Sequence, residues 1–381
     1  LCNRGSICLS YPIISGFSQA YSYYILKMKL ILHIGTEKTA TTTLQYFLYH
    51  NRKALLEQRI ALLDKLDQPC NRKMAAYCLP GEVFDDYFTD KNISSVSGKR
   101  KLFEPFLEDL RTEISKAQKK ADIVIITCEH FHSRLKDTAS IQKLHDLIKP
   151  YFDTIEICCY FREQSSLALS AYSTAIAAGE TNDFEVFLMD ATPGNHYYNY
   201  DSLFTKWAEV FGRQTLRPML YGSQHFYEGD IRRDFLRVAK ENIDFDQLDF
   251  NVADRNRRLG SVGLKLAQIN NILNPRYLQD GSQNKLRWAI FSAIQNSSAS
   301  SLGEHLFPQA SDIYCAFEES NISFASKFLG FKGNPFSAPE APAASAEKKL
   351  SGIQLDLDQI QDVMAQQENV VHSLSYPDSE N

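Results

Sequence analysis

Residues 30–44 contain an apolar run, a short loop and a threonine-rich helix start. The apolar residues 30–34 predict a buried strand, and Leu44, Phe47 and Leu48 form an apolar stripe at helical spacing. A strand, a tight loop and a helix in this order can bind phosphate, because the N–H groups and positive dipole end of the helix point at an anion. This feature predicts an α/β fold with an anion site at its first loop.

The loop departs from the Walker A pattern of nucleoside-triphosphate sites. Counting from Gly35, that pattern needs Gly at position 40, Lys at 41 and Ser or Thr at 42, whereas the chain has Ala, Thr and Thr there. The lysine is Lys38, inside the loop, where it cannot take the usual place on the β- and γ-phosphates. The loop therefore suits a shorter anionic group, although an ordinary strand–turn–helix whose threonines cap the helix stays an alternative.

A second segment carries the side chains expected at another phosphate. Residues 154–161 read as a buried strand that ends at Arg162, and a helix is expected from about 166 to 178, with Gly179 as its stop. Ser170 lies eight residues after Arg162, inside this helix. The guanidinium supplies a permanently charged bidentate fork and the serine adds a directional hydroxyl.

The two segments together resemble the PAPS-dependent sulfotransferases (PAPS is 3'-phosphoadenosine 5'-phosphosulfate). The bacterial branch often reads His-Ile-Gly-x-x-Lys-Thr-Gly-Thr-Thr, and residues 33–42 match this phrase except that Ala40 replaces the glycine. The resemblance covers roughly residues 28–332. It implies an α/β fold with a P-loop-type parallel sheet flanked by helices and with helical C-terminal additions.

The resemblance also implies roles for individual residues. The 5'-phosphosulfate would be held by the loop residues Lys38, Thr39, Ala40, Thr41, Thr42 and Thr43, and the 3'-phosphate by Arg162 and Ser170. Ala40 removes backbone freedom at a position where unusual dihedrals are needed close to phosphate. No metal is expected, because a lysine, N–H groups and hydroxyls can stabilise the single charge of a sulfuryl group.

Transfer requires a base, and the end of the strand expected at 122–127 is its predicted place. Parallel strands present their carboxyl ends to one crevice, and Glu129, His130 and His132 follow this strand. Glu129 is the first candidate, because the segment resembles the Ser-Glu-His phrase of bacterial relatives; His130 is second and His132 third. Either histidine is as readily a structural residue, and His33, within the first strand, is expected to be a packed residue.

Composition narrows the class of partner. The 381 residues carry a net charge of −5, which argues against nucleic acid, because no general basic excess is present. The eight cysteines form no Cys-x-x-Cys pair, and we interpret them as reduced core residues of a cytoplasmic protein rather than as a disulfide frame or a zinc site. A small-molecule or glycan acceptor is expected, and the aromatic run 196–200 either stacks on sugar or, preferably, packs within its loop.

The remaining elements follow from hydrophobic periodicity. Helices are expected at about 104–119, 141–148, 201–211, 234–240, 261–273 and 312–328, with a strand near 215–221 that Pro218 limits to an edge or a short strand. Residues 64–101 are expected to be polar and irregular.

Three regions are expected along the chain: a disordered extension at 1–27, the α/β domain at 28–332, and a linker and tail at 333–381. The extension lacks a run of the ~20 apolar residues that a membrane span needs, so no stable membrane insertion is expected, with a Golgi-type signal anchor as the alternative. The tail contains an amphipathic stretch at 353–364 that either docks as a helix or, preferably, frays.

The function predicted from these features is sulfuryl transfer from PAPS to a hydroxyl of a glycan, glycolipid or other small acceptor. Two alternatives stay open. A P-loop kinase would also use a strand–loop–helix site, and a sulfotransferase-like protein without activity would bind PAPS or its product without transfer.

Overall fold

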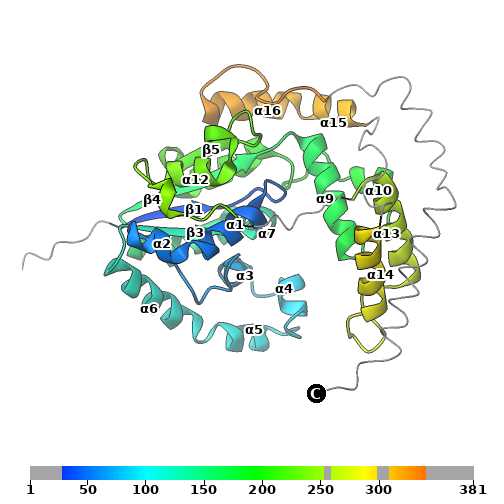
Figure 1. Cartoon of the computed structure of the whole chain (residues 1–381), viewed down its shortest axis with the longest axis horizontal. Helices are drawn as coiled ribbons and strands as arrows, with labels where there is room; N and C mark the ends of the chain where they lie inside the picture. The colour runs from blue at the N-terminus through cyan, green and yellow to red at the C-terminus, as the bar shows by residue number, and fades with distance from the viewer. Residues whose placement is uncertain (1–27, 253–258, 298–308, 340–381) are drawn as a thin grey trace, which may run out of the picture.

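The computed structural model describes residues 28–252, 259–297 and 309–339, so the expected extension 1–27 and most of the expected tail lie outside the described residues. In these ranges the fold is built on a five-stranded sheet with the order β2-β3-β1-β4-β5, in which all neighbouring strands run parallel (Figure 1). The strands are β1 (Lys29–His33), β2 (Ile60–Leu62), β3 (Ile123–Thr127), β4 (Thr154–Phe161) and β5 (Leu216–Leu220).

Helices connect the strands and continue beyond the last one. The first part of the chain contains α1 (Thr41–His50), α2 (Arg52–Glu57), α3 (Arg72–Cys78), α4 (Asp86–Thr89), α5 (Val96–Phe103), α6 (Phe106–Gln118), α7 (His130–Arg134) and α8 (Thr138–Ile148). The second part contains α9 (Gln164–Ala178), α10 (Phe184–Leu188), α11 (Tyr200–Phe211), α12 (Ile231–Ala239), α13 (Ser261–Leu273), α14 (Lys285–Asn296), α15 (Ala310–Ala316) and α16 (Glu318–Phe324). The parallel sheet, its flanking helices and the later helical additions confirm the predicted α/β fold.

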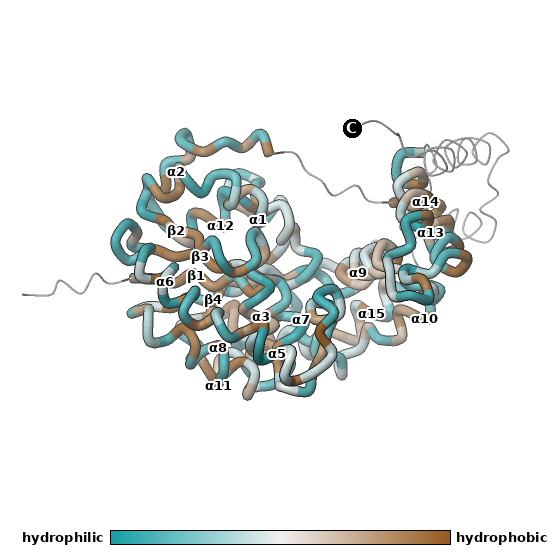
Figure 2. Tube along the Cα trace, turned by 90° about the horizontal axis from the view of Figure 1, so that it is seen from below, coloured by the Kyte–Doolittle hydropathy of each residue, from teal (hydrophilic) through white to brown (hydrophobic). Residues whose placement is uncertain are grey.

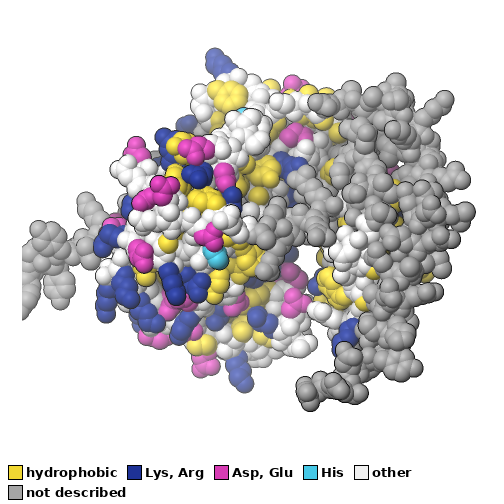
Figure 3. Space-filling model, viewed as in Figure 1, with side chains coloured by type: hydrophobic (Ala, Val, Ile, Leu, Met, Phe, Trp, Pro, Cys, Tyr) yellow, Lys and Arg dark blue, Asp and Glu magenta, His cyan; other side chains and the backbone are white. Residues whose placement is uncertain are grey.

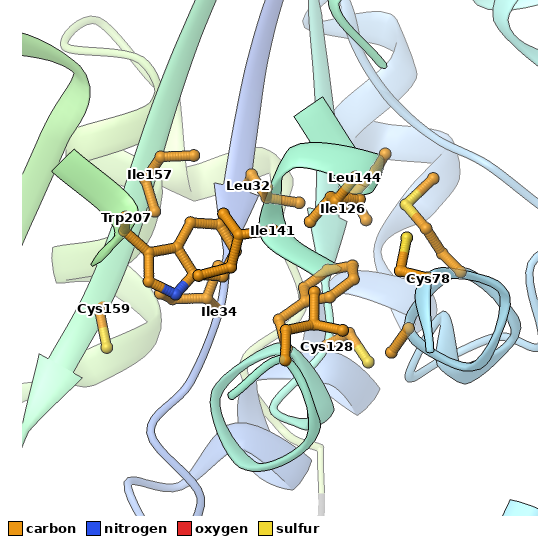
Figure 4. Close-up of a cluster of buried hydrophobic side chains, with 14 of the residues drawn as sticks. Leu32, Ile34, Cys78, Ile126, Cys128, Ile141, Leu144, Ile157, Cys159 and Trp207 are labelled. Atoms are coloured by element: carbon orange, nitrogen blue, oxygen red, sulfur yellow. The ribbon is translucent and has the colours of Figure 1, made fainter. Parts of the chain in front are cut away.

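Both faces of the sheet are buried, which explains why its strands are almost continuously apolar. One face packs against α1, α2 and α12, with Ile31 and Ile125 contributing from the strands. The other face, where Leu32 contributes from β1, packs against α3, α6, α8, α11 and α16. Figure 4 shows this second core, in which Trp207 and Ile141 reach toward the strands, and Figure 2 shows apolar residues along β1, β3 and β4.

A separate small core lies at the far end of α9. Tyr172 and Ile176 of α9 pack there with buried apolar residues of α13 and α14, such as Leu264 and Phe291. In Figure 1, α10, α13 and α14 form a group at the side of the molecule, joined to the sheet region through α9. The helix that follows β4 therefore belongs both to the main body and to this side group.

The order of the strands identifies a switch point in the sheet. After β1 the chain builds β2 and β3 on one side, and then crosses to the other side for β4 and β5. In open parallel sheets, ligands bind outside the carboxyl ends of the strands at such a point. The loops after β1, β3 and β4 carry the predicted site residues, and they meet at this edge.

The structure corrects several predicted elements. Residues 64–101 are not irregular, because α3, α4 and α5 lie there, and β2 and α14 were not predicted. The helix expected at 312–328 is divided into α15, α16 and a short wider turn at Ala325–Leu329. The strand β4 and the helix α13 have the predicted bounds, Gly179 ends α9 in the left-handed conformation, and β5 is an edge strand.

Among the described helices, none has both the length and the apolar character needed to cross a bilayer. Acidic and basic side chains are interspersed over the face seen in Figure 3.

Candidate active site

The loop after β1 continues the sheet by pairing with β4. The backbone N–H and the Oγ1 hydroxyl of Thr36 both donate to the carbonyl oxygen of Tyr160, each at 3.1 Å, and the N–H of Tyr160 donates to the Gly35 carbonyl at 2.9 Å. Arg162 follows Tyr160 by two residues. The backbone ladder thus fixes the loop relative to the end of β4.

The loop enters α1 through left-handed backbone. Lys38 has φ 66°, and Ala40, the residue that precedes the helix, has φ 58° and ψ 28°. Glycine adopts this region at little cost, whereas a side chain with a Cβ is disfavoured there. The prediction that unusual dihedrals are needed at position 40 is therefore confirmed.

The threonines do not act as a cap for α1. The residue at the capping position is Ala40, whose methyl group accepts no hydrogen bond. Thr39 is buried and its hydroxyl donates to the carbonyl of Thr36 at 2.7 Å, so this side chain holds the loop together. The first turn of a helix presents backbone N–H groups that the helix does not pair, and Thr41, Thr42 and Thr43 form that turn. An anion at this end would meet backbone N–H groups.

Arg162 reaches the loop from the end of β4. Its Nη1 atom donates to the carbonyl oxygen of Lys38 at 3.4 Å, and its guanidinium lies 5.5 Å from the ring centre of Tyr221. The Nζ amine of Lys38 donates to the hydroxyl of Thr174 on α9, and that hydroxyl donates to the carbonyl of Ser170 at 3.3 Å. The structure thus places Lys38, Arg162 and the turn of α9 that contains Ser170 beside one another.

Glu129 lies at the β3–α7 junction, in close contact with the loop that follows β1. A Cβ atom at Gly35 would lie 3.3 Å from the Cα atom of Glu129, so a glycine is needed for this close approach as well as for its φ of 110°. The carboxylate oxygen Oε2 of Glu129 accepts from Nε2 of Gln45 at 2.5 Å and from the thiol of Cys70 at 3.6 Å. Burial, aided by the nearby charge of Glu37, raises the pKa of Glu129 above its usual range.

His132 is held by both of its ring nitrogens. Nδ1 accepts from the backbone N–H of Glu37 at 3.4 Å, so Nε2 donates to the carbonyl of Tyr197 at 2.9 Å. The ring is fully buried, and burial lowers its pKa to about 4. Both nitrogens of this buried ring are hydrogen-bonded, which favours a structural role for His132.

Burial also lowers the pKa of His130 to about 4, and its Nδ1 atom lies 3.7 Å from Oε1 of Glu37. The other oxygen of Glu37 accepts from the hydroxyl of Tyr197 at 3.0 Å. The Glu37 carboxylate is therefore held on the side of the loop that faces His130 and the loop at residues 195–199.

The aromatic run 196–200 packs within the protein. Tyr198 and Tyr200 are buried, and the Tyr200 hydroxyl donates to the carbonyl of Arg162 at 2.5 Å. His196 donates through Nε2 to the carbonyl of His132 at 3.0 Å. These contacts agree with the preferred prediction of loop packing.

Two further expectations concern buried residues. His33 is buried, with Nδ1 2.9 Å from the Thr127 hydroxyl and a pKa lowered by burial to about 3, so it is a packed residue as predicted. Cys78, Cys128, Cys158 and Cys159 are buried free thiols. Cys70 and Cys315 differ from the expectation, because Cys70 is partly buried beside Glu129 and Cys315 is exposed.

The contacts of Thr174, Gln45, Glu37 and Tyr197 were not predicted from the sequence. Their partners lie between 84 and 160 residues away in the chain, so no local pattern joins them. Gln45 gave one signal, because it is a polar residue on the buried stripe of α1 that includes Leu44 and Leu48.

No protein-family model matches the chain, and no curated protein matches it either. Among solved structures, it is similar to a sulfotransferase from Alicyclobacillus acidocaldarius, with 17% sequence identity and a TM-score of 0.34. The alignment covers 64% of this chain and 94% of that one. The functional assignment therefore rests on the geometry of the site.

Proposed function

We propose that the protein transfers the sulfuryl group of PAPS to a hydroxyl of a glycan, glycolipid or other small acceptor. The observation that supports this most directly is the 3.4 Å contact between Nη1 of Arg162 and the carbonyl oxygen of Lys38. It joins two cationic segments, 124 residues apart, at one sheet edge. Two anion-binding segments at a fixed separation suit a ligand with two anionic groups, and PAPS is such a ligand.

In this proposal the two ends of PAPS have different partners. The first turn of α1 and Lys38 hold the 5'-phosphosulfate, and Arg162 with Ser170 holds the 3'-phosphate. Lys38 also donates to Thr174 on α9, which keeps its ammonium between the two segments. The developing charge on the leaving oxygen is then stabilised by an amine and N–H groups that are in place before the reaction.

The chemical step is an in-line displacement. The acceptor oxygen forms a bond to sulfur as the bond from sulfur to the 5'-phosphate oxygen breaks, and 3'-phosphoadenosine 5'-phosphate leaves. The proton of the acceptor passes to the base. Glu129 suits this role better than His130, because a carboxyl with a raised pKa is a stronger base than an imidazole whose pKa has fallen to about 4. Base assistance of this kind contributes on the order of 100- to 10,000-fold.

Calorimetry tests the binding half of the proposal. 3'-Phosphoadenosine 5'-phosphate should bind, and Lys38→Ala and Arg162→Ala should each weaken binding about 10- to 150-fold, the effect of losing a hydrogen bond to a charged group. Lys116→Ala and Arg111→Ala, which remove exposed cations of α6, are the matched controls and should bind normally. Tight binding of ATP or GTP in place of the 3'-phosphorylated nucleotide would favour the kinase alternative.

A turnover assay with labelled sulfate tests the catalytic half. Lys38→Ala and Arg162→Ala should abolish transfer while circular dichroism shows a folded protein. Full activity of either variant would remove that residue from its role. Nucleotide binding without any transfer to a panel of glycan and small hydroxyl acceptors would instead support a protein that binds PAPS without activity.

A further inference from the structure

Three potential metal ligands of different chemistry meet beside the loop. Cys70 precedes α3, and Glu129 and His130 lie at the β3–α7 junction. One ligand atom from each of the three residues lies within 4.8 Å of the other two. The thiol of Cys70 already contacts Oε2 of Glu129 at 3.6 Å.

The donor set selects the kind of ion. Calcium and magnesium prefer oxygen ligands alone, whereas zinc is bound by thiolate, imidazole and carboxylate in tetrahedral sites. With metal–ligand bonds of about 2.0–2.3 Å, the ligand atoms of a tetrahedral zinc site lie roughly 3.5 Å apart. The three ligand atoms lie within 4.8 Å of one another, so side-chain rotations that shift an atom by about 1 Å bring them to this spacing.

A second observation concerns the imidazole of the same histidine. Among the described residues, Nδ1 of His130 belongs to the buried polar atoms without a hydrogen-bond partner. The Oε1 atom of Glu37, 3.7 Å away, is too distant to form a hydrogen bond with it. A buried polar atom of this kind calls for an explanation such as a bound ion.

The surroundings also suit a cation. Arg72 and Arg134 are the positive charges that act on His130, and both are paired with Asp85 and Asp86, Arg72 at 2.6 and 2.8 Å, which offsets their repulsion. Gln45 donates to Oε2 of Glu129 and so fixes the orientation of one ligand, as outer-shell partners do in metal sites. Three protein ligands leave a fourth position for water, as in open zinc sites.

We propose that Cys70, Glu129 and His130 bind a zinc-type divalent ion. We further propose that this ion inhibits sulfuryl transfer because it coordinates the carboxylate of Glu129, the proposed base. Binding forms bonds from the ion to the sulfur, one carboxylate oxygen and one imidazole nitrogen, and the thiol proton passes to solvent. The inhibitory half rests on the proposed function, because a coordinated Glu129 carboxylate cannot accept the proton of the acceptor. The binding half does not depend on it.

Cobalt titration tests the binding half. The full chain is freed of metal with a chelator and titrated with Co²⁺, whose bond to a thiolate gives a charge-transfer absorption band. We expect one saturable site, displaced by Zn²⁺, with affinity at least tenfold lower in Cys70→Ser and His130→Ala. Cys315→Ser, which changes an exposed cysteine of α15, is the matched control and should keep the band. No saturable site, or an unchanged band in Cys70→Ser, would overturn the assignment.

Transfer assays with zinc test the inhibitory half. Each protein is compared with its own zinc-free rate, and we expect zinc to inhibit the unchanged chain but to inhibit Cys70→Ser at least tenfold less strongly. Activation by zinc, or equal inhibition of both proteins, would overturn this half. Calorimetry with 3'-phosphoadenosine 5'-phosphate in zinc-free buffer tests the proposed function separately, and the cobalt band requires no activity, so the two failures are distinguishable.

Discussion

Replacing Ala40 by glycine should stabilise the protein, against the usual effect of adding a glycine. Ala40 has φ 58° and ψ 28°, and holding a residue with a Cβ in this left-handed region costs about 1–2 kcal/mol. Glycine removes that cost, but its greater freedom in the unfolded chain offsets about 0.4–1 kcal/mol of the gain. The expected net effect is a rise of about 0.5–1 kcal/mol in the free energy of unfolding.

Thermal unfolding measures this effect. For a domain of about 300 residues 1 kcal/mol corresponds to about 1.5–2 °C, so the Tm of Ala40→Gly should rise by about 1–2 °C. The matched control is Ala208→Gly in the interior of α11, where the backbone is an ordinary helix and glycine should lower stability by about 1 kcal/mol. The two substitutions are chemically identical, so their opposite signs isolate the backbone conformation.

The contradicting outcome is a fall in the Tm of Ala40→Gly like that of Ala208→Gly. That result would mean that residue 40 does not adopt left-handed backbone, and that the N–H groups of the first turn of α1 do not point where the proposed site needs them. A rise in Tm together with unchanged binding of the nucleotide would agree with a loop that keeps its shape at lower cost.

Three further outcomes follow from the site. Glu129→Gln should lower transfer by about 100- to 10,000-fold if Glu129 is the base, while transfer by the unchanged chain should rise with pH as this carboxyl loses its proton. Burial raises the pKa of Glu129 in the folded protein, so ionisation of this carboxyl disfavours folding at neutral pH. Glu129→Gln should therefore raise the Tm at pH 7, and this gain should disappear below pH 4.5, the ordinary pKa of a glutamate. Scanning calorimetry at several pH values measures both effects. The pKa of His132 is lowered in the folded protein from 6.5 to about 4, so the free energy of unfolding should fall by on the order of 3 kcal/mol as the pH drops from about 6.5 toward about 4. Urea unfolding of His132→Gln should show a smaller fall over the same pH range. An equally steep loss in that variant would assign the acid sensitivity to other groups.

The main features of the fold could be predicted because burial on both faces leaves a strong local pattern. Strand β4 was predicted at its observed bounds, since six of its eight residues are apolar or thiol side chains, with Thr154 and Glu156 as the exceptions. The short strand β2 has only three residues and was missed. Helix α3 was missed because it has only seven residues, and its buried set includes a charged residue, Arg72, and two alanines, which leaves little apolar periodicity.

The site could be predicted only in part, for a related reason. Lys38 and Arg162 stand next to strands and helix starts, so sequence order alone suggests that they converge on one edge. The partners that fix the geometry come from other loops: Tyr197 donates a hydrogen bond to Glu37, and Cys70 donates one to Glu129. Such pairs depend on how loops pack after folding, and a single sequence carries no periodic trace of them.

Helix α9 has a mechanical consequence. One of its turns carries Thr174, which accepts the hydrogen bond of Lys38, and the adjoining turns carry Tyr172 and Ile176, which pack against α13 and α14. The same helix therefore supports both the hydrogen bond of Lys38 and the small core at the side of the molecule. We expect substitutions that loosen this core to alter the position of Thr174, and with it the position of the Lys38 amine.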